Sequence, residues 1–358
     1  MEYRCLGKHG PIVSALGLGC RSFGKSGVTP EACQSVVRKA LDLGINFFDT
    51  ADVYGDGRSE EYLARALADV PRDSYVIATK GGTERLGPRA ERQNARPEFL
   101  RRSLENSLSR LKTDYVDVYQ LHNPDPEVPL EVAAEAFNRF IEEGKIRCVG
   151  ISNMDREEID EWLRFVPRTV SVQLPYSLLD TSRVNSVFPP GHNLPISLIP
   201  WAPLFIGFVT NPPVVDPNSR TGVLGMLPAD FVERGLEACA LLKEMAADYG
   251  TTESALALAF VLARPEVAVV PVGTTNPSHL EEDAECLEVR IAEGDLSKLK
   301  EAAAKVPPPT IPVSFEVTEL LAGGRIAVLP LGLKIRVPKG TRVGDRITVN
   351  LWDGKVMD

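Results

Sequence analysis

Four side chains of the types that move protons occur within the first 122 residues of the chain. Asp49, Lys80 and His122 each end a run of mostly apolar residues, and Tyr54 follows Asp49 by five positions in a glycine-containing loop. Any one of them alone is commonly just a solvated group. Their occurrence together, on three successive apolar runs, indicates a shared site.

These four residue types suit the protonation of an oxygen atom. A tyrosine, with a pKa of about 10, is a weak acid at neutral pH, and an ammonium such as that of Lys80 favours the phenolate and lowers this pKa. Asp49 would keep Lys80 charged, and His122 would donate to a carbonyl oxygen and orient the substrate. The set fits a reaction in which a hydride reaches the adjacent carbon. Acyl transfer fits less well, because no Ser or Cys nucleophile with a base partner is evident.

The elements that must position these residues form eight repeats of an apolar run followed by a helical pattern. Runs with nearly continuous apolar character are typical of strands buried on both faces of a parallel sheet. Eight such units predict an α/β fold, a (β/α)8 TIM barrel, whose strands carry the chemistry at their carboxyl ends. A doubly wound sheet is the competing fold, but residues 17–22 have Ser where its dinucleotide fingerprint needs a third glycine. The predicted strands are 15–19, 45–50, 75–80, 115–122, 146–152, 170–174, 197–201 and 267–273, and the clearest helices are 29–43, 97–112, 129–144 and 295–306.

The composition divides the chain into three parts. Residues 1–306 carry the predicted barrel, the proline-rich stretch 307–312 is a stiff linker, and residues 313–358 form a small β-rich appendage. In the appendage, apolar and polar residues alternate from 331 to 337, which predicts a strand. Asp353-Gly354 is typical of a hairpin turn.

The motifs of the first part resemble the aldo-keto reductase family over about residues 3–306. The resemblance implies a (β/α)8 barrel and NAD(P)-dependent reduction of an aldehyde or ketone. It assigns Tyr54 as the proton donor, Lys80 and Asp49 as the residues that tune it, and His122 as the residue that orients the substrate. The matching segments are 46–55, 59–63, 78–81, 117–122, 149–153, 173–176, 201–204 and 271–283.

The same resemblance implies where a nicotinamide cofactor binds. Ser152 and Asn153 match the pair that binds the nicotinamide amide, and Gln173 matches its third polar partner. Trp201 stands where the family stacks an aromatic ring on the nicotinamide, which leaves the other face open for hydride transfer; a core aromatic is the alternative. The further positions assigned to the cofactor are Pro203, Leu204, Gly273, Thr274, Thr275, His279, Glu282 and Asp283.

The chain departs from the family where many members bind the 2′-phosphate of NADP. Asn276 and His279 stand at positions that are often basic, and Glu281 and Glu282 lie close by. A dianionic phosphate without a guanidinium would be poorly held there. The predicted cofactor is therefore NADP or NAD, and the weakened phosphate site makes NAD, or weak discrimination between the two, more plausible than in a typical member of the family. A basic residue from the long interval 201–267, such as Arg220, would compensate.

The predicted function is hydride transfer between nicotinamide and the carbonyl or alcohol group of an aldehyde, ketone or sugar. Cys20 and Arg21 stand where the family often has larger aromatic residues, so we expect them to line a roomier or more polar substrate pocket. The interval 201–267 is interpreted either as a lid over this pocket or as a surface insertion. Two other functions stay open: a redox-neutral sugar epimerase or lyase with tightly held NAD, and a nicotinamide-sensing regulatory protein.

The C-terminal part differs from the barrel in both pattern and charge. Residues 333–349 resemble the C-terminal β-domain of DnaJ-type co-chaperones, in which similar strands contribute to binding exposed peptide; a plain β-appendage is the alternative. Residues 310–358 carry a net charge of +2, whereas the rest of the chain carries −11. We therefore expect this tail to contact its own barrel or a protein partner.

The overall composition excludes several other classes of function. The net charge of −9 disfavours binding to nucleic acid. No apolar run is long enough to span a membrane, and the first residues lack the apolar region of a secretory signal. The six dispersed cysteines and four dispersed histidines predict reduced thiols, no metal site and a cytoplasmic protein.

Overall fold

The computed structural model describes residues 1–87, 90–210, 226–329, 334–352 and 354–357. Eight parallel strands form one sheet in the order β11-β10-β9-β8-β5-β4-β3-β12. A parallel bridge between Leu198 and Val267 joins the two ends of this order, so the sheet closes into a barrel. This confirms the predicted (β/α)8 fold, with all eight predicted strands present. Their bounds are β3 (Leu16–Gly19), β4 (Phe47–Asp49), β5 (Val76–Gly81), β8 (Val116–Leu121), β9 (Ile146–Ser152), β10 (Thr169–Pro175), β11 (Ser197–Trp201) and β12 (Val270–Val272).

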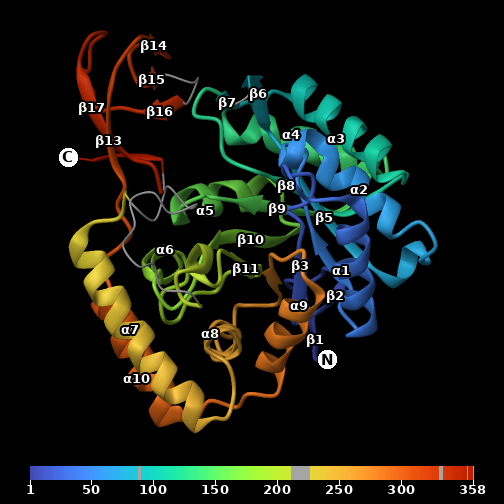
Figure 1. Cartoon of the computed structure of the whole chain (residues 1–358). Coiled ribbons are helices and arrows are strands. Elements are labelled where there is room, and N and C mark those ends of the chain that lie inside the picture. The colour runs from blue at the N-terminus through green and yellow to red at the C-terminus, as the bar shows by residue number, and fades with distance from the viewer. Residues whose placement is uncertain (88–89, 211–225, 330–333, 353, 358) are drawn as a thin grey trace.

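Amphipathic helices surround the barrel (Figure 1). α1 begins after Thr29, whose side chain accepts a hydrogen bond from the backbone N–H of Ala32, and Pro30 follows at the first helical position. The leucines of α3 that the sequence pattern places on one stripe, Leu100 and Leu104 among them, are buried against the strands. The helices are α1 (Pro30–Asp42), α2 (Arg58–Ala66), α3 (Pro97–Leu111), α4 (Leu130–Glu142), α5 (Arg156–Phe165), α6 (Ser182–Val187), α7 (Ala229–Asp248), α8 (Glu253–Leu262), α9 (Pro277–Ala284) and α10 (Glu293–Lys305).

Alternate residues of each strand face the barrel interior, because successive side chains of a strand point to opposite faces. The lower interior is filled by a small apolar cluster that includes Phe47, Ala78 and Val118. Leu6 and Val13 join this cluster from the N-terminal hairpin of β1 (Tyr3–Cys5) and β2 (Ile12–Ser14), which the sequence pattern did not predict. The next inward positions, toward the carboxyl ends of the strands, are therefore free to carry polar groups.

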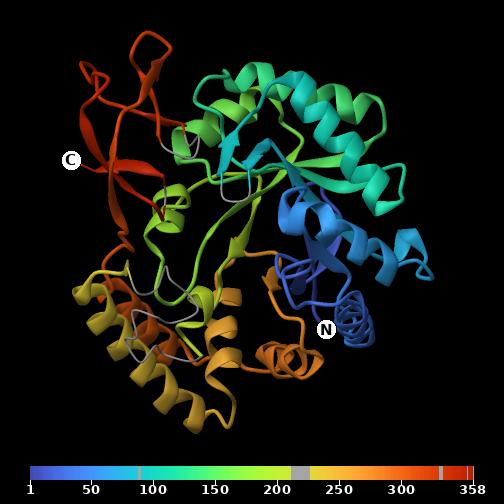
Figure 2. The same cartoon turned by 45° about the horizontal axis from the view of Figure 1, so that its top comes forward.

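The long interval between β11 and β12 contains two helices in its described part. α8 is the regular barrel helix, and α7 packs along α10 on the outside of the barrel (Figures 1 and 2). α7 thus fits the surface-insertion alternative. Residues 211–225, including Arg220, lie outside the described residues.

The C-terminal residues form two small antiparallel sheets with a core of their own. Predicted β-structure is present here, although β13–β15 were not anticipated. The predicted strand at 331–337 is represented by β16, with 331–333 outside the described residues; the predicted turn joins β17 to β18, with Asp353 itself not described. The core consists of Val317, Ala327, Leu329, Ile335 and Val349. The sheets are β13 (Pro312–Glu316), β17 (Arg346–Asn350) and β18 (Lys355–Met357), and β14 (Glu319–Leu321), β15 (Ile326–Val328) and β16 (Lys334–Arg336).

The tail, residues 310–357, contacts its own barrel through opposite charges. Lys334 is only 5% exposed, and its ammonium pairs with Glu127 and lies 3.6 Å from Asp125. Lys355 lies 3.7 Å from Asp155 near the start of α5. These acidic residues follow β8 and β9, so the tail lies at the carboxyl-end rim of the barrel, beside α5 in Figure 1. Basic residues of the tail thus pair with acidic residues of the barrel of the same chain.

Replacing Lys334 with Ala is expected to release the tail from the barrel. The substitution leaves the Asp125 carboxylate, which is 2% exposed, without its cation, and breaking a buried pair from one side costs about 3–5 kcal/mol. Limited proteolysis of the linker 307–312 should then be faster than in the wild type. Lys339→Ala changes an exposed lysine of the same tail and serves as the control. A Lys334→Ala protein as resistant as the control would contradict this role.

Candidate active site

The pleat of the strands brings three predicted catalytic residues to one level. Asp49 and Lys80 continue the inward series of β4 and β5, two positions beyond Phe47 and Ala78, and His122 follows β8 directly. Gly81, next to Lys80, has no room for a side chain, because a Cβ there would clash with the Tyr119 hydroxyl. The strand alternation and this close packing together fix where the Lys80 side chain emerges.

Lys80 and Asp49 form a buried ion pair at the centre of the site. Lys80 is 1% exposed and Asp49 5% exposed. The ammonium Nζ donates to both Asp49 carboxylate oxygens at 2.8 Å and to the backbone carbonyl of Thr50 at 2.8 Å. Burial by itself lowers the pKa of Lys80, but the interactions with Asp49 and Tyr54 outweigh it, and the pKa is raised. Lys80 is therefore an ammonium at neutral pH.

Tyr54 lies beside this ion pair. Its ring centroid is 5.2 Å from Lys80 Nζ and 5.9 Å from the His122 ring centroid, with the two rings edge to face. Tyr54 begins a 3-10 turn, Tyr54–Gly57. Gly55 follows with φ of 59°, and a Cβ there would lie 2.9 Å from the carbonyl oxygen of Phe23. Glycine at this position lets the loop fold back and present Tyr54 at the rim.

His122 is a neutral imidazole in this environment. Burial lowers its pKa to about 3, with further lowering by the positive charges of Lys80 and Arg21. Its Nδ1 atom is buried without a hydrogen-bond partner among the described residues. A neutral ring carries one N–H donor and one acceptor. His122 can therefore donate a hydrogen bond to a substrate oxygen and remain uncharged.

Two glutamines around Asp49 complete the interior of the site. Gln120 Nε2 donates to Asp49 Oδ1 at 3.3 Å, and Gln173 Nε2 lies 3.4 Å from Asp49 Oδ2. The family resemblance assigns Gln173 to the cofactor and gives no role to Gln120. The signal was present, because Gln120 precedes His122 by two residues and must face the same side of its strand.

The residues predicted to hold the nicotinamide lie together next to His122. Asn153 Nδ2 donates to the backbone carbonyl of His122 at 3.2 Å, and Trp201 Nε1 donates to Asn153 Oδ1 at 3.1 Å. Ser152 is buried, with its hydroxyl donating to the carbonyl of Gln173 at 3.2 Å. Asn123 and Arg183, which also contact Asn153, were not anticipated from the sequence. The cluster joins the ends of β8, β9, β10 and β11.

The backbone after β11 is strained. Ala202, Phe205 and Ile206 have positive φ values of 51°, 47° and 56°, which is a true outlier for a β-branched residue such as isoleucine. Such strain persists where the surroundings over-determine it and tends to occur at functional sites. This segment also contains Pro203, which is buried, and Leu204, which is partly exposed.

The family model of the aldo/keto reductases matches residues 15–304. The chain belongs to this family. It is 32% identical over 305 residues to a probable aldo-keto reductase 1 of Glycine max, covering 83% of this chain and 87% of that protein. It is also 32% identical over 290 residues to aldo-keto reductase YhdN of Bacillus subtilis, covering 78% and 87%.

Solved structures agree with this membership. The glycerol dehydrogenase AKR11B4 of Gluconobacter oxydans has a TM-score of 0.75 at 25% identity and covers 86% of this chain and 96% of that one. A thermostable aldo-keto reductase, Tm1743, in complex with the inhibitor epalrestat has a TM-score of 0.68 at 28% identity, covering 84% and 100%. The protein is thus an oxidoreductase of the NAD(P)-dependent aldo-keto reductase type. The family match ends at residue 304, so the C-terminal sheets lie outside it.

The segment after β12 begins α9 with little positive charge. Gly273, Thr274 and Thr275 are partly or fully exposed and lead to Asn276, whose side chain accepts from the N–H of Ser278 at 3.0 Å and caps the helix. The side-chain oxygen of Asn276 is therefore already used in a hydrogen bond within the protein.

The other predicted α9 residues differ in exposure. His279 and Glu282 are exposed, and Asp283 is 7% exposed. Burial raises the pKa of Asp283 to about 6. Lys39 of α1 approaches this region, but it pairs with Glu281 at 2.5 Å.

The two predicted substrate residues have different surroundings. Arg21 is exposed, and its positive charge contributes to lowering the pKa of His122. Cys20 is fully buried, with its backbone N–H donating to the carbonyl of Asp49 at 2.7 Å. The backbone of the buried Cys20 thus contacts that of Asp49, whereas the Arg21 side chain is exposed to solvent.

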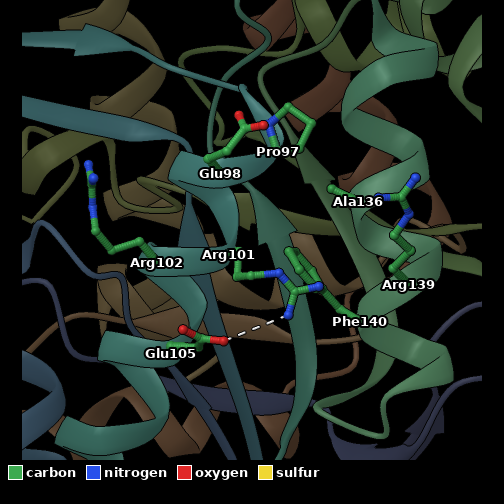
Figure 3. A pocket seen from close by; sticks show the side chains of 8 residues that line it. All are labelled: Pro97, Glu98, Arg101, Arg102, Glu105, Ala136, Arg139 and Phe140. Carbon is green, nitrogen blue, oxygen red and sulfur yellow. Dashed lines mark ion pairs between the residues drawn. The ribbon is translucent and has the colours of Figure 1, made fainter.

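Two hollows elsewhere in the molecule do not coincide with these residues. A groove of about 300 Å³ lies between α3 and α4 and contains Arg101, Arg102 and Arg139 (Figure 3). Arg101 pairs there with Glu105 at 3.7 Å. A cleft of about 600 Å³ lies between the tail and the residues that follow β5, with Lys334 in its lining. None of the predicted site residues lines either hollow.

The described residues offer neither a metal site nor a membrane-spanning helix. No three His, Cys, Asp or Glu side chains there are grouped so that they would hold a metal ion. None of the helices found in that part of the chain is long and apolar enough to cross a membrane.

The neutral state of His122 gives a pH prediction. With a folded pKa of about 3 and an unfolded pKa of about 6.5, the unfolded state binds more protons between these values, so His122 makes the protein less stable as pH falls from about 6.5 to 3. Its ring signals in NMR spectra, assigned by comparison with His122→Asn, should stay constant from pH 8 to pH 5. A change in these chemical shifts with its midpoint near pH 6.5 would contradict the prediction, because it would show that the ring takes up a proton in the folded protein.

Proposed function

We propose that the protein interconverts a carbonyl and an alcohol, with Tyr54 as the general acid in reduction and the general base in oxidation. The observation that carries the proposal is the buried Lys80–Asp49 pair beside Tyr54, with the neutral His122 across from it. A charged ammonium next to a phenol favours loss of the phenolic proton. The same charge stabilises the phenolate that remains after the proton has left.

The side chains divide the work of carbonyl reduction. Tyr54 gives its proton to the carbonyl oxygen, and His122 donates a hydrogen bond that orients this oxygen. Asp49 holds Lys80 in place and keeps it charged, with Gln120 and Gln173 satisfying the outer lone pairs of Asp49. The nicotinamide, when bound, supplies the hydride that adds to the carbonyl carbon. The proton and the hydride together convert the carbonyl to an alcohol.

The residues around Asn153 fit a nicotinamide amide. Gln173 Oε1 is buried without a hydrogen-bond partner among the described residues, so it offers an acceptor to an amide N–H. Ser152 and Asn153 would supply the other polar contacts, and the indole of Trp201 an apolar face. For the substrate, we propose a small aldehyde, ketone or sugar carbonyl. The likeness to a glycerol dehydrogenase supports starting with small polyols and their oxidised forms.

Tyr54→Phe tests the proposed acid. It removes one hydroxyl and keeps the ring next to Lys80 and His122, so kcat for carbonyl reduction should fall by about 10²–10⁴ while cofactor affinity stays unchanged. Turnover is followed by nicotinamide absorbance over a panel of aldehydes, ketones and sugars. Tyr62→Phe, a partly buried tyrosine of α2, is the matched control. Equal turnover of Tyr54→Phe and wild type on every active substrate would remove Tyr54 from the mechanism.

We propose further that NAD is preferred to NADP, because α9 carries Glu281 and Glu282 and no lysine or arginine. His279→Arg should lower KM for NADPH about tenfold, since it adds a charge-assisted hydrogen-bond donor for the 2′-phosphate. KM for NADH should not change. His9→Arg adds the same charge at an exposed position in the loop between β1 and β2 and is the control. A wild-type protein that already prefers NADPH would refute the proposed preference.

A further inference from the structure

We propose that Trp352, carried by the tail outside the family match, is a positioning residue of the active site. It holds Trp201 and the strained backbone after β11 in the arrangement that receives the nicotinamide. The inference rests on the proposed role of Trp201 as the ring that packs against the cofactor. It gives the C-terminal sheets a part in catalysis that neither their sequence nor the family match assigns.

Trp352 lies directly on the aromatic residues of the β11 end. Its ring centroid is 5.3 Å from that of Trp201, with 44° between the planes, and 4.9 Å from that of Phe205. Its indole Nε1 donates to Asp180 Oδ2 at 2.8 Å. The ring is therefore fixed both by packing and by a hydrogen bond to the buried Asp180 side chain.

The position of Trp352 in the tail is itself well determined. It lies at the turn between β17 and β18, just after Asn350, which is 7% exposed. Asn350 Oδ1 accepts from the backbone N–H groups of Ile311 at 2.8 Å and Trp352 at 3.1 Å, and Nδ2 donates to the carbonyl of Pro309 at 3.1 Å. One buried amide thus ties the hairpin turn to the chain leaving α10.

Trp352 also covers the strained segment. Phe205, with φ of 47°, is fully buried between Trp352 and Phe231 of α7, whose ring lies 5.1 Å from it. A residue in the left-handed region costs about 1–3 kcal/mol and is kept there only by its surroundings. Without the indole, the Phe205 side chain loses one of its three aromatic neighbours and keeps Phe208 and Phe231, and the segment can relax.

The contact continues from Trp201 to the catalytic residues. The Trp201 indole donates to Asn153, and Asn153 donates to the carbonyl of His122. Trp352 touches both Trp201 and Phe205 and makes no contact of its own with Tyr54 or Lys80 among the described interactions. Its effect on the reaction must therefore pass through Trp201 and the β11 end. This predicts a defect in cofactor binding rather than in proton transfer.

Trp352→Ala tests the inference. The affinity for NADH, and for NADPH if that is the better ligand, should fall about tenfold, because small displacements of a positioning group have large effects. Affinity is measured by ultrafiltration of the full chain, which needs no turnover. Trp352→Phe keeps a ring against Trp201 and should bind within about threefold of the wild type. Leu351→Ala, at an exposed neighbour that is 44% exposed, should bind as the wild type does.

Two readouts separate positioning from a loss of fold. In the cofactor-free protein, the two adjacent indoles should give a coupled signal in circular dichroism that disappears equally in Trp201→Phe and Trp352→Phe. The loss of affinity in Trp352→Ala should also be smaller when Trp201→Phe is already present, because residues that act through each other are not additive. Full additivity would contradict the proposed route through Trp201.

The outcomes distinguish this inference from the proposed function. If the wild type binds the dinucleotide and Trp352→Ala binds it equally well, Trp352 has no positioning role and the proposed function stands. If the wild type binds neither NADH nor NADPH, the proposed function fails, and the inference fails with it.

Discussion

The buried pair of Lys80 and Asp49 is the interaction on which the rest of the candidate active site depends. Removing two charges from water carries a penalty that attraction alone often fails to offset, and apolar residues of similar size are commonly as stabilising. The pair is therefore a poor device for stability. Its value lies in holding a permanent cation beside Tyr54, in a place too dry for water to screen it. The barrel must satisfy every remaining polar atom of the pair to keep it there.

The barrel meets this demand through the alternation of its strands. The inward-facing side chains of β4, β5 and β8 are apolar toward the amino ends of the strands and polar toward the carboxyl ends. The ion pair therefore lies between the apolar cluster of the barrel interior and the rim. Gln120, one step below His122, turns its amide to Asp49. The neutral His122 completes the arrangement, because a second cation near Lys80 would be unfavourable. The cation of Lys80, the neutral ring of His122 and the neighbouring ring of Tyr54 thus follow from one geometry.

The sequence indicated which side chains would meet wherever the strand period of two residues and the spacing of the strands decide their contacts. Asp49, Lys80 and His122 end apolar runs, and the parallel barrel necessarily gathers such ends, so the meeting of these three residues at one end of the barrel was predictable. Gln120 was predictable in principle by the same alternation. The N-terminal hairpin and the tail strands β14 and β15 were not, because three-residue strands leave almost no periodic signal. The position of Trp352 depends on long-range docking, which no local pattern encodes.

The tail shows how an enzyme surface can be extended without altering the barrel. A small core of their own makes the appended sheets stiff. Lys334 attaches them beside the loops after β8 and β9. Asn350 fixes the position of the hairpin that carries Trp352. The strained turn after β11 needs a cover, and the tail provides one from a distant part of the chain. Residues near a barrel rim are free to vary because strands, not loops, carry the fold. A rim element with its own core can therefore change what the site binds while the Lys80–Asp49 pair and its strands stay as they are.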